Sequence, residues 1–105
     1  MVRLLADPAE ILTPTIAIYE VYKVLKRDAS EEDALLAVAQ MLRTNVIPLS
    51  ETLALEAADA SLENSLAMAD AIVYATARAR GAELVTTDAD LEGLPGVAFL
   101  SKKKG

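Results

Sequence analysis

The sequence predicts an α/β fold, a parallel sheet flanked by helices. Short aliphatic and β-branched runs alternate with longer helical patterns, which is typical of parallel strands joined by helices. With 105 residues, of which 53% are hydrophobic, the chain can form one compact core and is too short for two ordinary domains. We therefore expect a single domain over residues 1–105, in which residues 101–105 form a solvated basic tail.

The first half of the chain predicts a short extended piece, two helices and a strand, over 9–12, 14–27, 30–43 and 45–49. Thr13 offers a hydroxyl that can cap the first helix, and Pro14 suits its first position. Ser30 with Asp33 three residues later resembles a capping box at the start of the second helix.

The second half predicts two helices, two strands and a turn-rich loop, over 50–62, 66–80, 83–87, 97–100 and 88–96. Ser50 is the expected cap of the first of these helices, and Gly81 is expected to close the second. In parallel sheets the functional sites lie beyond the carboxyl ends of the strands, so the residues that follow each strand are the candidates for chemistry.

Composition removes several classes of site. The chain has no cysteine and no histidine, which excludes disulfides, thiol nucleophiles, imidazole or thiolate metal ligands and every Ser-His-Asp triad. The net charge of -6 argues against broad attraction to nucleic acid, so any such contact must be local. No segment reaches the roughly 20 apolar residues of a membrane span, and the chain does not begin with a signal-peptide pattern, so a cytoplasmic location is expected.

Asp70 is the one charged residue in an apolar run of helical length, residues 66–77. Burying an ionised carboxylate without a partner costs several kcal/mol, so Asp70 needs a supporting group. Two interpretations stay open. Asp70 caps a helix that begins at Ala71, or it binds a metal ion.

Two further carboxylates lie in comparable settings. Glu20 stands among apolar residues, which favours an inward position, although a surface residue paired with Lys23 is the alternative. Asp88 directly follows a predicted strand, where aspartate also commonly begins a turn. Oxygen ligands of this kind suit Mg²⁺ or Mn²⁺, and such a cation can generate hydroxide for phosphoester hydrolysis. The spacing does not distinguish phosphodiesters from phosphomonoesters.

Two other ligand sites are rejected. The segment 88–93 partly imitates a calcium loop, but Phe99 stands where the bidentate glutamate is needed, and a strand rather than a helix follows. The glycines form neither of the standard nucleotide-binding motifs.

Three segments carry a family resemblance: TPTIAIYEV at 13–21, LAMADAIVYATA at 66–77 and GAELVTTDADL at 81–91. Together they resemble the PIN-domain ribonucleases, in particular the VapC-type toxins of toxin-antitoxin pairs. The resemblance implies a metal-dependent endoribonuclease in which Glu20, Asp70 and Asp88 are catalytic and bind Mg²⁺ or Mn²⁺. It further implies that Asp90 assists as a metal ligand, and that a hydroxyl of Thr86 or Thr87 orients a ligand.

The resemblance also implies partners. The substrate would be RNA, and a cognate antitoxin protein would insert into the acidic groove. Surplus aliphatic residues make a homodimer plausible as well.

The chain departs from the family at its start. Family members begin with an aliphatic central strand that ends in a metal-binding aspartate, followed by a helix. Residues 3–6 are too short and too helical in character to be that strand, and Asp7 does not replace its aspartate. We expect a PIN-like fold that lacks its first central strand and helix, either because its start is truncated or because the chain is a degenerate relative. We expect it to be inactive or weakly active as a hydrolase. The alternative is a noncatalytic PIN-like module whose acids receive a protein partner.

Overall fold

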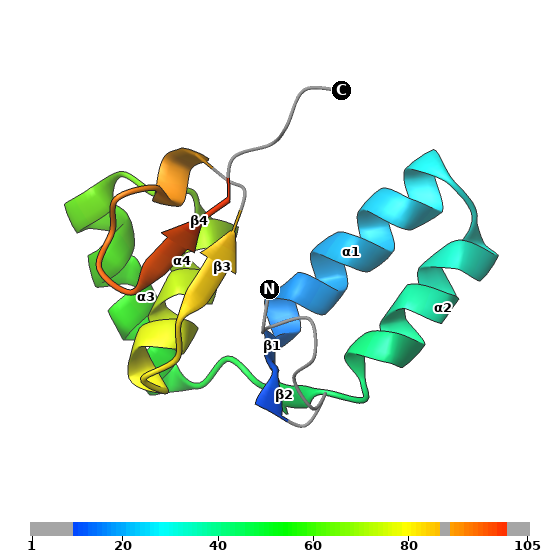
Figure 1. Ribbon diagram of the computed structural model, residues 1–105, viewed down its shortest axis with the longest axis horizontal. Coiled ribbons are helices and arrows are strands. Elements are labelled where there is room, and N and C mark those ends of the chain that lie inside the picture. The colour runs from blue at the N-terminus through cyan, green and yellow to red at the C-terminus, as the bar shows by residue number, and fades with distance from the viewer. Residues whose placement is uncertain (1–9, 87–88, 101–105) are drawn as a thin grey trace. The chain divides into compact units, whose positions relative to one another are not determined.

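The computed structural model describes residues 10–86 and 89–100, which fall into two compact units divided between Leu49 and Ser50 (Figure 1). Within these described residues, each unit contains one pair of α-helices and one pair of parallel strands. Asp88, Thr87 and the basic tail at 101–105 lie outside the described residues, as does the start of the chain at 1–9. The single domain over 1–105 stays a prediction.

The first unit has a β-α-α-β order: β1 (Leu12–Pro14), α1 (Thr15–Asp28), α2 (Glu31–Met41) and β2 (Asn45–Ile47). The two helices form a hairpin and pack side by side (Figure 1). The two strands pair in parallel, with Leu12 opposite Asn45. The backbone N–H of Asn45 also donates to the Ile11 carbonyl at 2.9 Å, so the pairing begins just before β1.

The start of α1 differs from the prediction. Thr13 and Pro14 belong to β1, and the helix begins at Thr15 without a side-chain cap from Pro14. The Thr13 hydroxyl is instead hydrogen-bonded to the hydroxyl of Thr44, and the Thr15 hydroxyl donates to the Ile47 carbonyl at 3.1 Å. Pairing with the distant strand β2 therefore replaces the local cap that the sequence suggested.

The start of α2 agrees with the prediction. The Ser30 hydroxyl accepts a hydrogen bond from the backbone N–H of Asp33 at 3.0 Å, as a capping serine does. The helix ends at Met41, two residues earlier than expected, because Arg43 donates its backbone N–H to a turn bond with Gln40.

The core of the first unit is thin. None of the residues of α1, all of which are described, is fully buried. Ala34 of α2 and Ile47 of β2 are the buried apolar side chains of this unit among the described residues, together with the polar Thr13.

The second unit has an α-α-β-β order: α3 (Glu51–Asn64), α4 (Met68–Ala79), β3 (Leu84–Thr86), a 3-10 turn η3 (Ala89–Leu91) and β4 (Val97–Phe99). The strands β3 and β4 lie side by side and point the same way (Figure 1), with Leu84 opposite Val97. The Ser50 hydroxyl accepts from the backbone N–H of Leu53 at 3.1 Å, which confirms the predicted cap of α3.

Most of the buried side chains belong to the second unit. Ala71 and Ala75 of α4 and Ala57 of α3 are buried, and such small residues let two packed helices approach closely. Tyr74 is also buried, and its hydroxyl donates to the Pro95 carbonyl at 3.0 Å. This bond connects α4 to the turn that leads into β4.

The end of α4 agrees with the predicted role of Gly81. Gly81 has a φ of +64°, and its N–H donates to the Arg78 carbonyl at 3.1 Å. The N–H of Ala82 donates to the Ala77 carbonyl at 2.9 Å. These two bonds form a Schellman motif, in which glycine is favoured because the backbone is left-handed.

The α/β class and the parallel pairing are confirmed. Within the described ranges the strands pair two by two, as β1 with β2 and β3 with β4, and the helices supply the remaining regular structure. In that same part of the chain, no helix is both long and apolar enough to cross a bilayer.

Candidate functional site

Asp70 lies in the first turn of α4, two residues after the helix begins at Met68. Its side chain is half-buried, next to Ala71 and Ile72, which are only 1% and 8% exposed. The interpretation of Asp70 as a cap for a helix starting at Ala71 is wrong, because the cap position belongs to Ala67. The positive end of the helix dipole favours the ionised carboxylate here. Asp70 therefore lies beside the core of its unit, at a helix end that favours a negative charge.

The carboxyl end of β3 is the second part of the candidate site. Thr86 ends this strand, is half-buried, and accepts the backbone N–H of Leu100 at 2.8 Å through its carbonyl. Asp90 follows in η3 and is exposed. Asp88 and Thr87 lie between them in sequence and outside the described residues.

Glu20 of α1 is exposed, so the expected inward position is wrong. The half-buried apolar side chains of α1 include Ile18, Val21 and Leu25, which recur at helical spacing along one face. Glu20 lies off this face because successive residues of a helix are about 100° apart. Its surroundings in sequence are apolar, but its position on the helix is on the solvent side.

The predicted metal ligands are not assembled within the described residues. Over 10–86 and 89–100, no three or more aspartates and glutamates lie close enough together to hold a metal ion. Asp88 is not among those residues, and Glu20 belongs to a different unit from Asp70 and Asp90. The site with Glu20, Asp70, Asp88 and Asp90 as ligands stays a prediction. Its donor chemistry fits Mg²⁺ or Mn²⁺, because carboxylate oxygens are the ligands these ions prefer.

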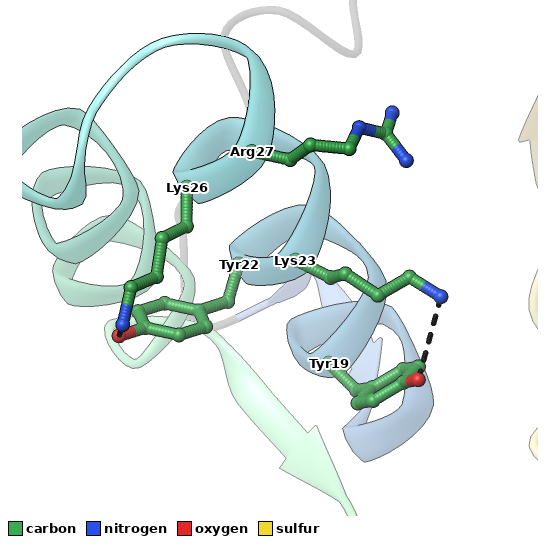
Figure 2. A pocket seen from close by; sticks show the side chains of 5 residues that line it. All are labelled: Tyr19, Tyr22, Lys23, Lys26 and Arg27. Carbon is green, nitrogen blue, oxygen red and sulfur yellow. Dashed lines mark hydrogen bonds between the residues drawn. The ribbon is translucent and has the colours of Figure 1, made fainter.

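A feature that the sequence analysis missed lies on α1. Five side chains line an open hollow of about 410 Å³, shown in Figure 2: Tyr19, Tyr22, Lys23, Lys26 and Arg27, hereafter the Tyr-Lys face. Their spacing of three and four residues places them on one broad side of the helix. The signal in the sequence was the repeated Tyr-x-x-x-Lys spacing at 19–23 and 22–26.

Each lysine of the Tyr-Lys face folds back over a tyrosine. The Lys23 ammonium lies 5.0 Å from the ring centre of Tyr19, and the Lys26 ammonium lies 5.4 Å from that of Tyr22. Each also donates to the hydroxyl of the same tyrosine at 3.4 Å, and the Lys23 bond is drawn in Figure 2. The hydrogen bond that Lys26 donates to Tyr22 is the main reason why the pKa of Lys26 lies above its ordinary value of 10.5.

Comparison with known proteins identifies the family. The model of the PIN domain family matches residues 1–97. A search of curated proteins gave no match. Among solved structures, a toxin-antitoxin complex from Klebsiella pneumoniae is 30% identical with a TM-score of 0.74, and the match covers 91% of this chain and 78% of that one.

Two more distant structures share the fold. DNA-bound VapBC from Salmonella typhimurium is 18% identical with a TM-score of 0.74, covering 93% of this chain and 80% of that one. The toxin VapC20 of Mycobacterium tuberculosis, which cleaves the sarcin-ricin loop, is 20% identical with a TM-score of 0.69. The match covers 87% of this chain and 72% of that one. The family match, which spans most of the chain, and the 30% identical structure agree. The chain belongs to the PIN domain family.

Proposed function

We propose that this protein is a Mg²⁺- or Mn²⁺-dependent endoribonuclease of the toxin type, which cleaves RNA phosphodiester bonds. The observation that carries the proposal is the half-buried Asp70 in the first turn of α4, in a chain that belongs to the PIN domain family. The similar VapC20 structure is that of a toxin that cleaves the sarcin-ricin loop, which supports RNA as the substrate.

The chain's own residues have separate roles in this proposal. Asp70 would be a metal ligand on a regular helix, where the positive end of the helix dipole favours the ionised form of its carboxyl group. Asp88 and Asp90, which follow β3 in the sequence, and Glu20 of α1 would supply the other carboxylates. When bound, the cation supplies an activated water and stabilises charge on the phosphodiester. The Thr86 or Thr87 hydroxyl orients a ligand beside it.

A cognate antitoxin is the proposed protein partner. The similar structures from Klebsiella pneumoniae and Salmonella typhimurium are a toxin-antitoxin complex and a VapBC assembly. Because the proposed site is acidic, a basic antitoxin segment that enters it would compete with the metal and the RNA. Self-association of the chain remains a proposal alongside it.

The second candidate function is a noncatalytic PIN-like module that binds a protein partner. The observation that favours it is an open hollow of about 440 Å³ on α2, lined by Glu31, Glu32, Leu35 and Leu36. The two leucines are 52% and 61% exposed, and an apolar surface edged by acids suits a basic amphipathic segment.

Cleavage of RNA by the full chain tests the proposal. We expect the wild-type protein to cut a labelled single-stranded RNA with Mn²⁺ and to stop when EDTA is added. Asp70→Asn should lower the rate by about 100-fold or more, because it removes a charged group from the reacting centre. Asp59→Asn is the matched control, since Asp59 is an exposed aspartate on α3 and loses the same charge.

The outcomes separate the two functions. Equal cleavage by wild type and Asp70→Asn would show that Asp70 is not part of the site. If the wild type does not cut RNA, and Mn²⁺ neither binds nor changes its thermal stability while Asp70→Asn retains partner binding, the noncatalytic module is the correct function.

A further inference from the structure

The Tyr-Lys face concentrates positive charge in an acidic protein. The chain has 10 lysines and arginines against 16 aspartates and glutamates, yet three of the cations fall within residues 23–27. Lys23, Lys26 and Arg27 are all exposed. Because the chain is acidic overall, it can contact nucleic acid only through a local cluster of cations, and this face provides one.

The three cations on this face differ in how far a neighbouring group already compensates their charge. Arg27 donates to both carboxylate oxygens of Asp28, at 2.7 and 2.9 Å, so part of its charge is already compensated. Lys23 and Lys26 donate to tyrosine hydroxyls at the long distance of 3.4 Å, and Lys26 is also attracted by the carboxylate of Glu31. These exposed bonds are weak, and a phosphate can replace them at little cost.

The tyrosines add a second mode of contact. Tyr19 is 56% exposed and Tyr22 is half-buried, and both border the same hollow (Figure 2). Exposed aromatic rings beside cations are the combination that binds single-stranded nucleic acid, because the rings stack on bases while the cations contact phosphates. A paired duplex does not offer its base faces for stacking, and an acidic protein segment has no need of the rings.

We propose that the Tyr-Lys face binds single-stranded RNA, with Lys23 and Lys26 on the phosphates and Tyr19 stacked on a base. The inference rests on the proposed function and gives it a substrate-positioning surface. From Tyr19 to Arg27 the helix rises about 12 Å, which spans about three nucleotides stacked at ~3.4 Å each.

The face adjoins the candidate carboxylate of α1. Glu20 is three residues from Lys23 and seven from Arg27, so these side chains occupy neighbouring positions on the helix surface. RNA held by Lys23 would therefore run past Glu20. The bound RNA would then lie beside one of the four carboxylates proposed as ligands of the cation.

Binding without cleavage tests the inference. Fluorescence anisotropy of the full chain with a labelled unstructured RNA of about 12 nucleotides is measured in EDTA across a range of salt concentrations. The double variant Lys23→Gln/Lys26→Gln should weaken binding about tenfold and reduce the slope of log affinity against log salt by about 1.4, or ~0.7 per lost phosphate contact. Tyr19→Leu should weaken binding about tenfold without changing that slope.

Two control variants remove the same number of positive charges outside the Tyr-Lys face. Arg43→Gln/Arg80→Gln removes two exposed cations outside the face, and Lys102→Gln/Lys103→Gln removes two from the end of the chain. Both should bind RNA within about twofold of wild type, because phosphate contacts are local to the bound strand. Unchanged thermal melting shows that each variant is folded.

Three results would overturn the inference. The first is wild-type affinity in Lys23→Gln/Lys26→Gln, and the second is an equal loss in either matched variant. The third is binding of an oligoglutamate peptide as tightly as RNA through the same lysines, which assigns the face to an acidic protein partner. Because binding is measured in EDTA, a protein that binds RNA through this face but does not cut it contradicts the proposed function alone.

Discussion

The exposed Asp28 carboxylate shows how one neighbouring residue can shift the pKa of a surface group. Arg27 contacts it through two charge-assisted hydrogen bonds, which hold the pKa of Asp28 below its ordinary value of 3.8. A lowered folded-state pKa means that the contribution to stability is present above the unfolded pKa. It is lost as the pH falls through the folded pKa. Since both side chains are well exposed, solvent screens the pair and the contribution is small.

Removing the guanidinium tests this directly. In Arg27→Gln we expect the Asp28 pKa to rise toward 3.8, because the main cause of its lowering is gone. The measurement is an NMR titration of the Asp28 carboxyl carbon. Arg43→Gln serves as the control and should leave that pKa where it is. An unchanged Asp28 pKa in Arg27→Gln would mean that the pair does not persist in solution.

At the scale of elements, the helix ends that depend on hydrogen bonds within about one turn of the chain were predicted correctly. The caps at Ser30 and Ser50 and the Schellman motif at Gly81 each depend on atoms a few residues apart. The prediction failed at Thr13, where the competing hydrogen bond comes from Thr44, 31 residues away. A local sequence pattern around Thr13 does not include Thr44, so it could not predict that this hydrogen bond forms in place of the helix cap.

The cap at Ser50 gives an element-scale prediction. Ser50→Ala should lower the free energy of unfolding by about 1 kcal/mol, because it leaves the Leu53 N–H without its side-chain acceptor. Ser50→Asn retains an acceptor and should stay close to wild type. Urea denaturation followed by circular dichroism measures both. Equal losses in the two variants would show that the hydrogen bond is not what stabilises the start of α3.

The sequence predicts a chemistry for the candidate site but does not determine its geometry. The absence of cysteine and histidine limits the metal ligands to oxygen, and Asp70 stood out as a lone charge in an apolar run. The start of α4 at Met68 was not predictable, because Ala67 gives no capping signal. The exposure of Glu20 was missed because apolar neighbours in sequence do not determine which side of a helix faces solvent.

At the scale of the whole molecule, the proposed metal site requires carboxylates from distant parts of the chain to bind one cation. Glu20, Asp70, Asp88 and Asp90 lie up to 70 positions apart in a 105-residue sequence. Ligands of Mg²⁺ or Mn²⁺ lie only about 2 Å from the ion. A shared cation therefore requires all four carboxylates to meet, which is the central claim of the proposed function.

Paramagnetic broadening by Mn²⁺ tests whether these four carboxylates share one cation. NMR spectra of the full chain are recorded as substoichiometric Mn²⁺ is added, and again for Asp70→Asn. We expect the signals of Glu20, Asp70, Asp88 and Asp90 to broaden together and before others, and Asp70→Asn to abolish the effect at all four. Broadening centred on other acids, such as Glu31 and Glu32 of α2, or broadening that persists unchanged in Asp70→Asn, would contradict a shared metal site.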